Sequence, residues 1–423
     1  MRFNFDMKYA KYLLLLLLIP GFLTLTPLFA QEPLSLKAMI EEARERNPEI
    51  QAFRQRVKEK ELRAKAEGAL DDPLLKIEIE DIPTERPFNL GNSMLTRYTF
   101  SQMFPFPGKL SLKERMAMKE VLMASEEARW KELEIIAALK ETYYDYAFIS
   151  ESMKVTKGIK EILSEMARIA EARYSLGLAS QQDIIKAQVE ITLLINEILT
   201  LEAEKGGDRA RLKAIRNRDP SSPIGEPESV PRQKVDIKAD ELIERALDKN
   251  PGLRGMAFEI DVRETAIDLA NKNYYPDFMI GVAPIQKDGR FDTWDAMFTV
   301  NIPIWRKKYD NMAGEAKIGK EVLISKLKAE RNIKAMEVKE GAIKVEAAAR
   351  IRSLYETGLM PQAELSFGFS LTNYQTGKID FLALLDSERT LKRTKIEYIR
   401  ILSDYNKIIA SLEKIIGDEI AKE

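Results

Sequence analysis

A 65-residue segment without a proline limits the possible folds of this chain more than any other feature. Leu110 to Tyr174 contains a single glycine, Gly158, and its apolar and charged residues recur at helical spacing. An unbroken helix of this length extends for about 100 Å. A compact globular domain needs no such helix, so the sequence predicts an extended helical rod.

The rod has to reverse direction in the sequence YSLGLAS, residues 174–180. Gly177 can adopt the left-handed conformation that ends a helix, and Ser180 can cap the next one. The returning helix has isoleucines at helical spacing: Ile184, Ile191, Ile195 and Ile198. We therefore predict a hairpin of two long antiparallel helices with residues 176–178 at its tip.

The same plan occurs twice in the chain. At an offset of 203 residues, seven residues of the first half have identical counterparts in the second: Ile40, Glu41, Ala43, Asn47, Pro48, Pro73 and Ile77. The four prolines of residues 217–238 predict an extended connection between the copies. We expect a first repeat at 31–216, a proline-rich linker at 217–238 and a second repeat at 239–423, which form one intertwined domain.

Helix boundaries can be placed in both repeats. Asn47 and Asn250 each precede a proline that can occupy the first position of a helix. In the second repeat Gly358 and Pro361 predict a break or kink in the outbound helix. The second tip is expected at Thr376, Gly377 and Lys378, with Asp380 as the cap. The last helix has a coiled-coil seam made of Leu391, Tyr398, Leu402, Tyr405, Ile409, Leu412 and Ile416.

Between the short helices and the long one, the apolar period changes from 3.6 to 2. Four strands of roughly 8 to 11 residues are predicted, around residues 75–81, 97–104, 277–282 and 294–304, with aromatic residues near their ends. An ordinary sheet with one wet face would show the same alternation, but the lengths also fit tilted membrane-spanning strands. The polar face is predicted to carry Lys76, Glu78, Arg97, Asp277, Asp295 and Asn301. The fold class is thus mainly α with a small β part.

Composition excludes several classes of function. The 66 basic and 67 acidic residues give no electrostatic footprint for nucleic acid. The chain has no cysteine and no histidine, so disulfides, thiol nucleophiles, Ser-His triads and the usual zinc sites are excluded. No phosphate-binding loop occurs. We predict that the protein is not an enzyme and that it has no cofactor and no resident metal.

Residues 1–30 have the pattern of a secretory signal peptide. Lys8 and Lys11 precede the apolar run Leu13 to Ile19, and cleavage is expected near Gln31. An uncleaved membrane anchor is the alternative, although the run is shorter than the ~20 residues that span a bilayer. Met7 is an equally possible start.

Four strands cannot close a membrane barrel, because the smallest single-chain barrels have eight. Open strand edges in lipid leave backbone groups unpaired at a cost of several kcal/mol each. Several chains must therefore pool their strands. Two chains would make a barrel too narrow for a pore, whereas three would make one of twelve strands.

Residues 35–417 contain the two copies of one unit, the Asn-Pro helix starts, the sequence FPFPGKL before the long helix and the paired Tyr-x-x-Gly tips. In these features they resemble the outer-membrane efflux channels of TolC type. FPFPGKL and GKIDFLALLD look most like the outer-membrane components of cobalt, zinc and cadmium efflux systems. The resemblance implies a homotrimer in the outer membrane of a Gram-negative bacterium, with a twelve-stranded barrel in lipid and an α-helical tunnel in the periplasm. It also implies a periplasmic adaptor and an inner-membrane pump as partners.

In that family the two tips contact the adaptor, which assigns this role to Leu176, Gly177, Leu178, Thr376, Gly377 and Lys378. Acidic residues just after the tips narrow the resting channel, and Asp183 and Asp386 stand at the matching positions. A second carboxylate, which some members place three residues before Asp386, is here Ala383, so a double acidic gate is in doubt. The alternative for Asp183 and Asp386 is a solvated carboxylate favoured by the helix dipole.

Two further hypotheses stay open. Met103, Met279 and Met297 could be soft ligands for copper or silver, or they could simply fill space. The whole chain could instead be a periplasmic coiled-coil adaptor or scaffold without a membrane-spanning barrel. Adaptors usually have a single helical hairpin, whereas this sequence predicts two.

Overall fold

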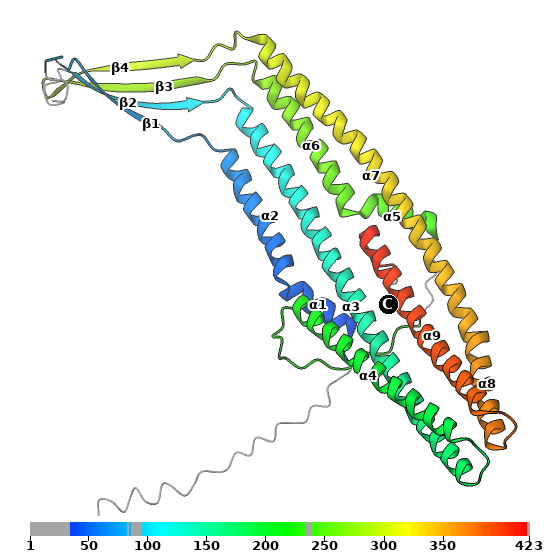
Figure 1. Ribbon diagram of the computed structural model, residues 1–423. Helices are drawn as coiled ribbons and strands as arrows, with labels where there is room; N and C mark the ends of the chain where they lie inside the picture. Colours follow the sequence, from blue (N-terminus) through cyan, green and yellow to red (C-terminus); the bar gives the residue numbers. More distant parts are fainter. Residues whose placement is uncertain (1–33, 83, 86–94, 233–237, 421–423) are drawn as a thin grey trace, which may run out of the picture.

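The protein is described by a computed structural model that covers residues 34–82, 84–85, 95–232 and 238–420. The predicted signal peptide, residues 1–30, lies outside the described residues. Within the described part the chain is mainly helical, with one small antiparallel sheet at one end of an elongated body (Figure 1). The predicted class, mainly α with a small β part, is confirmed.

The same order of elements occurs in both halves of the chain. The first half contains α1 (Leu36–Arg46), α2 (Pro48–Glu67), β1 (Leu74–Glu80), β2 (Leu95–Phe104), α3 (Lys109–Ser175) and α4 (Gln181–Ile215). The second half contains α5 (Ala239–Lys249), α6 (Pro251–Lys272), β3 (Phe278–Lys287), β4 (Arg290–Val300), α7 (Arg306–Leu354), a π-helical turn (Tyr355–Leu359), α8 (Met360–Gln375) and α9 (Phe381–Ile416).

The two Asn-Pro sequences start helices in the same way. The Asn47 side chain accepts hydrogen bonds from the backbone N–H groups of Glu49 and Ile50, and that of Asn250 accepts one from Leu253. Each asparagine also donates from Nδ2 to a carbonyl near the end of its own repeat, Asn47 to Ile215 at 2.8 Å and Asn250 to Ile415 at 2.6 Å. The caps therefore also attach the end of each return helix to the start of its repeat.

Helix α3 is unbroken over 67 residues and extends past the middle of the molecule to one tip (Figure 1). It packs against α2, α4, α6 and α9. The predicted seam of α9 is buried, with Leu402, Tyr405, Leu412 and Ile416 almost completely covered and Tyr398 partly covered. On α4 the prediction that Ile195 belongs to the core is wrong, because Ile195 is exposed and its neighbour Leu194 is buried in the core.

The connection between the halves lies against the middle of α3. The Tyr146 hydroxyl donates to the carbonyl of Gly225, and the Tyr143 hydroxyl accepts from the backbone N–H of Glu228. Val230 is buried in a cluster with Ala147 and Leu402. The described part of the proline-rich segment is thus an extended connection that packs against the helices.

The break predicted near Gly358 and Pro361 is instead the single π-helical turn between α7 and α8. The backbone N–H of Met360 bonds to the carbonyl of Tyr355, five residues earlier. Pro361 has no N–H to donate in the α pattern, and a wider turn accommodates this without ending the helix.

The sheet has the order β1-β2-β3-β4, with all neighbours antiparallel. All four strands are present, but β1 has seven residues and β4 ends at Val300, so Ile302 and Ile304 lie outside the strand in which they were expected. Tyr98 pairs with Ile77 and Ile280 pairs with Phe298, so apolar residues meet apolar residues across the strands. In the described part of the chain, no helix has the length and apolar character needed to cross a membrane.

Candidate functional surfaces

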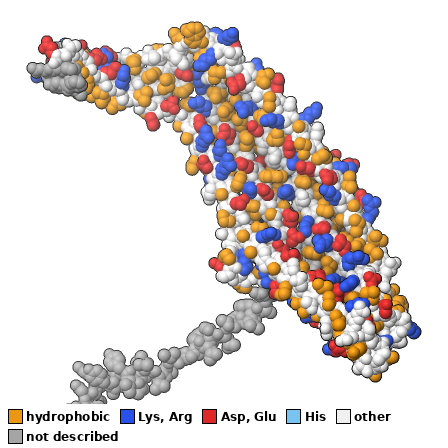
Figure 2. All heavy atoms as spheres, in the orientation of Figure 1, with side chains coloured by type: hydrophobic (Ala, Val, Ile, Leu, Met, Phe, Trp, Pro, Cys, Tyr) orange, Lys and Arg blue, Asp and Glu red, His pale blue; other side chains and the backbone are white. Residues whose placement is uncertain are grey.

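One face of the sheet is apolar and uncovered. Because directly paired residues lie on the same face, the register assembles one apolar surface from Leu75, Ile77, Ile79, Tyr98, Phe100, Ile280, Val282, Trp294, Ala296 and Phe298. Trp294 is 70% exposed and Phe298 is 69% exposed. An exposed apolar surface of this kind marks a lipid or protein contact. Figure 2 shows hydrophobic side chains along the sheet, whereas charges of both signs are interspersed over the helical body.

The opposite face carries four of the six predicted polar residues. Glu78 and Arg97 are direct cross-strand partners, and Lys76 bonds to Glu78 at 2.5 Å. Arg97 bonds to Glu80 at 2.6 Å and lies 3.7 Å from the Asp295 carboxylate on β4. These ion pairs are partly exposed, so each contributes little to stability, but together they make this face hydrophilic.

The other two predicted residues, Asp277 and Asn301, lie just before β3 and just after β4. The Asp277 carboxylate accepts hydrogen bonds from the Lys109 ammonium group at 2.8 Å and from the backbone N–H of Phe106 at 2.7 Å. Its own backbone N–H donates to the Asn301 side chain. The buried Lys109 opens α3, so this cluster fastens the sheet to the long helix.

At the other end of the molecule, the two hairpin turns have the same geometry. Gly177 and Gly377 have positive φ angles of 73° and 78°. Leu178 N–H bonds to Arg173 O, and Lys378 N–H bonds to Asn373 O, each five residues back. This is the Schellman arrangement, in which a left-handed residue lets the last carbonyls of a helix be satisfied. Both predicted turns are confirmed.

The caps of the return helices differ. The Asp380 side chain accepts from the backbone N–H of Ala383 at 2.8 Å, as predicted. Ser180 stands at the corresponding position but makes no side-chain cap bond, so that expectation is wrong. The first turn of α4 instead has the bond from Asp183 N–H to the Ser180 backbone carbonyl.

Arg173 joins the two tips. Its guanidinium donates to the carbonyls of Tyr374 and Gln375, at 2.9 and 3.1 Å, and to that of Leu178 at 3.2 Å. It also lies over the Tyr374 ring, 5.1 Å from the centroid. A cation is favoured where helix carbonyls end without partners. Sequence reasoning missed this residue, because a single arginine near a helix end has no distinctive pattern.

An open groove between the tips contains Asp183, and Asp386 lies elsewhere. The groove is lined by Arg173, Asp183, Tyr374, Lys378 and Phe381 among others. Burial raises the pKa of Tyr374, and the negative charge of Asp183 acts in the same direction. Asp386 is exposed on α9 and does not line the groove. Of the tip residues, Leu176 and Leu178 are 72% and 63% exposed, and Thr376, Gly377 and Lys378 are also exposed.

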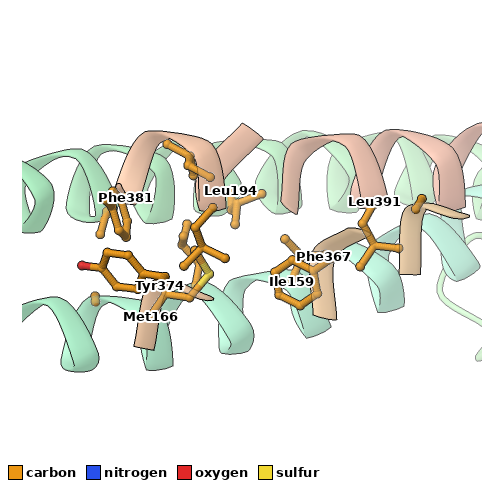
Figure 3. Close-up of a cluster of buried hydrophobic side chains, with 13 residues drawn as sticks. Ile159, Met166, Leu194, Phe367, Tyr374, Phe381 and Leu391 are labelled. Atoms are coloured by element: carbon orange, nitrogen blue, oxygen red, sulfur yellow. The ribbon is translucent and has the colours of Figure 1, made fainter. Parts of the chain in front are cut away.

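Behind the tips the two hairpins share one apolar core. Residues from α3, α4, α8 and α9 meet there, including Met166, Leu194, Phe367 and Phe381 (Figure 3). On α9, Glu388 is only 1% exposed, and its Oε1 has no hydrogen-bond partner among the described residues. Burial raises the pKa of Glu388 to about 7. Its spacing in the sequence, four residues after Leu384 and three before Leu391, was the signal that could have identified a carboxylate on the core side.

Comparison with known proteins gives matches over nearly the whole chain. Residues 39–218 match the family model "Outer membrane efflux protein". The chain is 23% identical over 409 residues to the cobalt-zinc-cadmium resistance protein CzcC of Cupriavidus metallidurans, and the match covers 93% of each chain.

Solved structures share the fold at low sequence identity. The outer-membrane channel MtrE of Neisseria gonorrhoeae, in its open state, has a TM-score of 0.76 at 14% identity and covers 92% of this chain and 90% of its own. CusC, whose crystal structures were described in terms of folding and transmembrane channel formation, has a TM-score of 0.75 at 15% identity. The match covers 90% of this chain and 92% of CusC. The first half of the chain is thus similar to the outer membrane efflux protein family, and the whole chain shares the fold of these outer-membrane channels.

Proposed function

We propose that three copies of this chain form the outer-membrane exit channel of a tripartite efflux system. The observation that carries the proposal is the sheet. Among the described residues its apolar face is uncovered, and its outer strands, β1 and β4, each have one unpaired edge. In lipid, such edges need strand partners. Three copies supply twelve strands, and the polar face with Lys76, Glu78, Arg97 and Asp295 then lines the pore.

The helical body supports assembly in the same way. Apolar side chains are exposed along α4 and α7 at Ile185, Val189, Leu193, Leu199, Ile318, Val322 and Ile343. Neighbouring subunits would cover these helices and complete an α-helical tunnel through the periplasm.

The tips are the contact for a periplasmic adaptor, through which an inner-membrane pump delivers the solutes. The exposed Leu176 and Leu178 offer an apolar contact, and Thr376, Gly377 and Lys378 offer a polar one. Asp183 and Asp386 are the proposed acidic residues of the entrance, which helix packing would hold narrow, and adaptor binding would favour a splayed state. The duct is passive and involves no bond chemistry.

Metal cations are the proposed cargo. CzcC is named for resistance to cobalt, zinc and cadmium. A duct whose lining has both signs of charge does not select strongly among cations, so selectivity belongs to the pump. The rival function, a soluble periplasmic adaptor or scaffold, leaves the apolar face of the sheet in water.

Membrane fractionation separates the two functions. We expect the full chain in the outer-membrane fraction, released only by detergent, as a trimer that dissociates on heating in dodecyl sulfate. Recovery of a monomer in the detergent-free periplasmic extract would contradict the channel and support the scaffold.

A further inference from the structure

Three methionines lie together on the polar face of the sheet, at the end nearest the helices. Met103 on β2 is the direct cross-strand partner of Met279 on β3. Met297 on β4 is paired with Gly281, two residues after Met279. Since the side chains of directly opposite and diagonal residues can touch, the three thioethers form one group, called here the methionine patch (Met103, Met279 and Met297).

Gly281 lets the Met297 side chain cross onto the neighbouring strand. A Cβ atom built at Gly281 would lie 3.0 Å from the Met297 methyl carbon, and 3.1 Å from the Ser101 side chain and the Phe100 carbonyl. The end of Met297 thus occupies the space above β3 that any larger residue would take. Its thioether is directed toward the row that contains Met279.

The patch is not part of an apolar core. It shares its face with the charged residues Arg97 and Asp295 and with their buried cross-strand partners Ile285 and Ala283. Met103 is 37% exposed and Met297 is 36% exposed. Methionine usually fills gaps inside cores, but the side chains of Met103 and Met297 are too exposed to serve only as core filler.

We propose that the methionine patch is a binding site for a soft monovalent cation, Cu(I) or Ag(I). Thioethers are soft neutral ligands that favour Cu(I), whereas Zn²⁺ and Co²⁺ favour nitrogen, oxygen or thiolate ligands. Neutral thioethers need no deprotonation, so proton release does not accompany binding. The chain has no cysteine or histidine that could compete for the ion.

The role of the site in export rests on the proposed function. In a trimeric barrel the three patches would lie at one level of the pore, where the tunnel meets the barrel. A partly exposed site of neutral ligands holds the ion weakly enough to release it, as conduction requires. Binding itself needs only the folded sheet.

Silver binding to the detergent-purified full chain tests the site. Titration with silver nitrate in chloride-free buffer should show one ion per chain, and X-ray absorption should show sulfur ligands only. The triple variant M103L/M279L/M297L should bind silver at least tenfold more weakly, since leucine keeps the volume and removes the sulfur. The matched control M118L/M312L/M336L changes three exposed methionines on α3 and α7 and should bind as the wild type does.

Equal silver binding by the patch variant and the wild type would overturn the proposal, as would oxygen or nitrogen ligands in the absorption spectrum. The single variant M297L serves if the triple variant does not fold, and it too should bind more weakly. The oligomeric state of the same preparations is scored separately. A wild-type monomer would count against the channel, and loss of silver binding in an intact trimer would confirm the site.

Discussion

The least expected residue is Glu388, a carboxylic acid buried beside the shared core of the two hairpins. The charged groups around it are Arg389 and Lys392 on its own helix and Glu190 and Glu197 on α4. Arg389 bonds to Glu190 and Lys392 to Glu197, so both cations have other carboxylate partners. The two cations therefore stabilise the negative charge of Glu388 only weakly, and burial is the main cause of its raised pKa.

Replacing Glu388 should change how stability depends on pH. With a native pKa of about 7 against an ordinary value of 4.5, the folded state holds a proton that the unfolded state loses between these pH values. Stability must therefore fall as pH rises from 4.5 to about 7, by roughly 3 kcal/mol in total. Glu388→Gln should abolish this loss and raise Tm at pH 8 but not at pH 4.5.

Thermal unfolding followed by circular dichroism at the two pH values measures this effect. The control is Glu165→Gln, which changes an exposed carboxylate on α3. If Glu388→Gln leaves the difference in Tm between pH 4.5 and pH 8 unchanged, the carboxyl is already ionised in the folded protein and the assigned pKa is wrong.

Arg173 should hold the two tips together. Arg173→Met removes three hydrogen bonds from a cation to carbonyls, each worth about 1 to 3 kcal/mol. Amide hydrogen exchange in residues 373–380 should become at least tenfold faster. Arg168→Met is the control, because Arg168 bonds to Glu165 on its own helix. Unchanged exchange in the Arg173 variant would mean that the shared core alone holds the tips.

At the scale of elements, the packing of α7 on α9 can be tested with two glycines of one helix. A Cβ at Gly341 would clash with a methyl carbon of Leu412, which is itself buried. No described residue lies within 4 Å of a Cβ at Gly319. Gly341→Ala should destabilise the protein by about 1 to 3 kcal/mol through overpacking. Gly319→Ala should stabilise it by about 0.5 to 1 kcal/mol through helix propensity.

Thermal unfolding of both variants shows whether each substitution raises or lowers Tm. Opposite shifts in Tm are expected. A stabilising Gly341→Ala would show that α7 and α9 can separate at no cost.

Elements with a strong local signal could be predicted from the sequence, and those set by tertiary contacts could not. The length of α3, the Asn-Pro caps and the Gly177 and Gly377 turns follow from backbone preferences within a few residues. The helix around Pro361 continues through a π turn because the wider turn accommodates the missing N–H of the proline, and α9 packs against this turn. Asp277 alternates with its neighbours like a strand residue, but Lys109, 168 positions away, makes it part of the base of the sheet.

The candidate site was predictable only in outline. Alternation separated the two faces of the sheet and placed Arg97 and Asp295 on the polar one. The contact between the tips through Arg173 and the position of Asp183 in their groove depend on how two distant hairpins meet, and no local pattern encodes that.

For the whole molecule, the two faces of the sheet should respond differently to charge. Ala296 and Asp295 are neighbours on β4 whose side chains lie on opposite faces. Ala296→Lys places a charge on the apolar face, at a cost of about 2 to 4 kcal/mol in the bilayer centre, and should reduce the outer-membrane trimer. Asp295→Lys should leave the trimer intact. Equal trimer yields, measured on unheated gels of membrane fractions, would show that the apolar face does not contact lipid.

Cross-linking between β1 and β4 is the most direct test of the claim that subunits pool their strands. These strands lie at opposite edges of the sheet, about 14 Å apart at ordinary strand spacing, so a disulfide cannot join them within one chain. The chain has no cysteine of its own. Ile77→Cys would be combined in turn with cysteine at Trp294, Ala296 or Phe298, and membranes would be oxidised. We predict covalent dimers and trimers for at least one pair and none for any of the four single-cysteine variants; monomers for every pair would contradict the shared barrel.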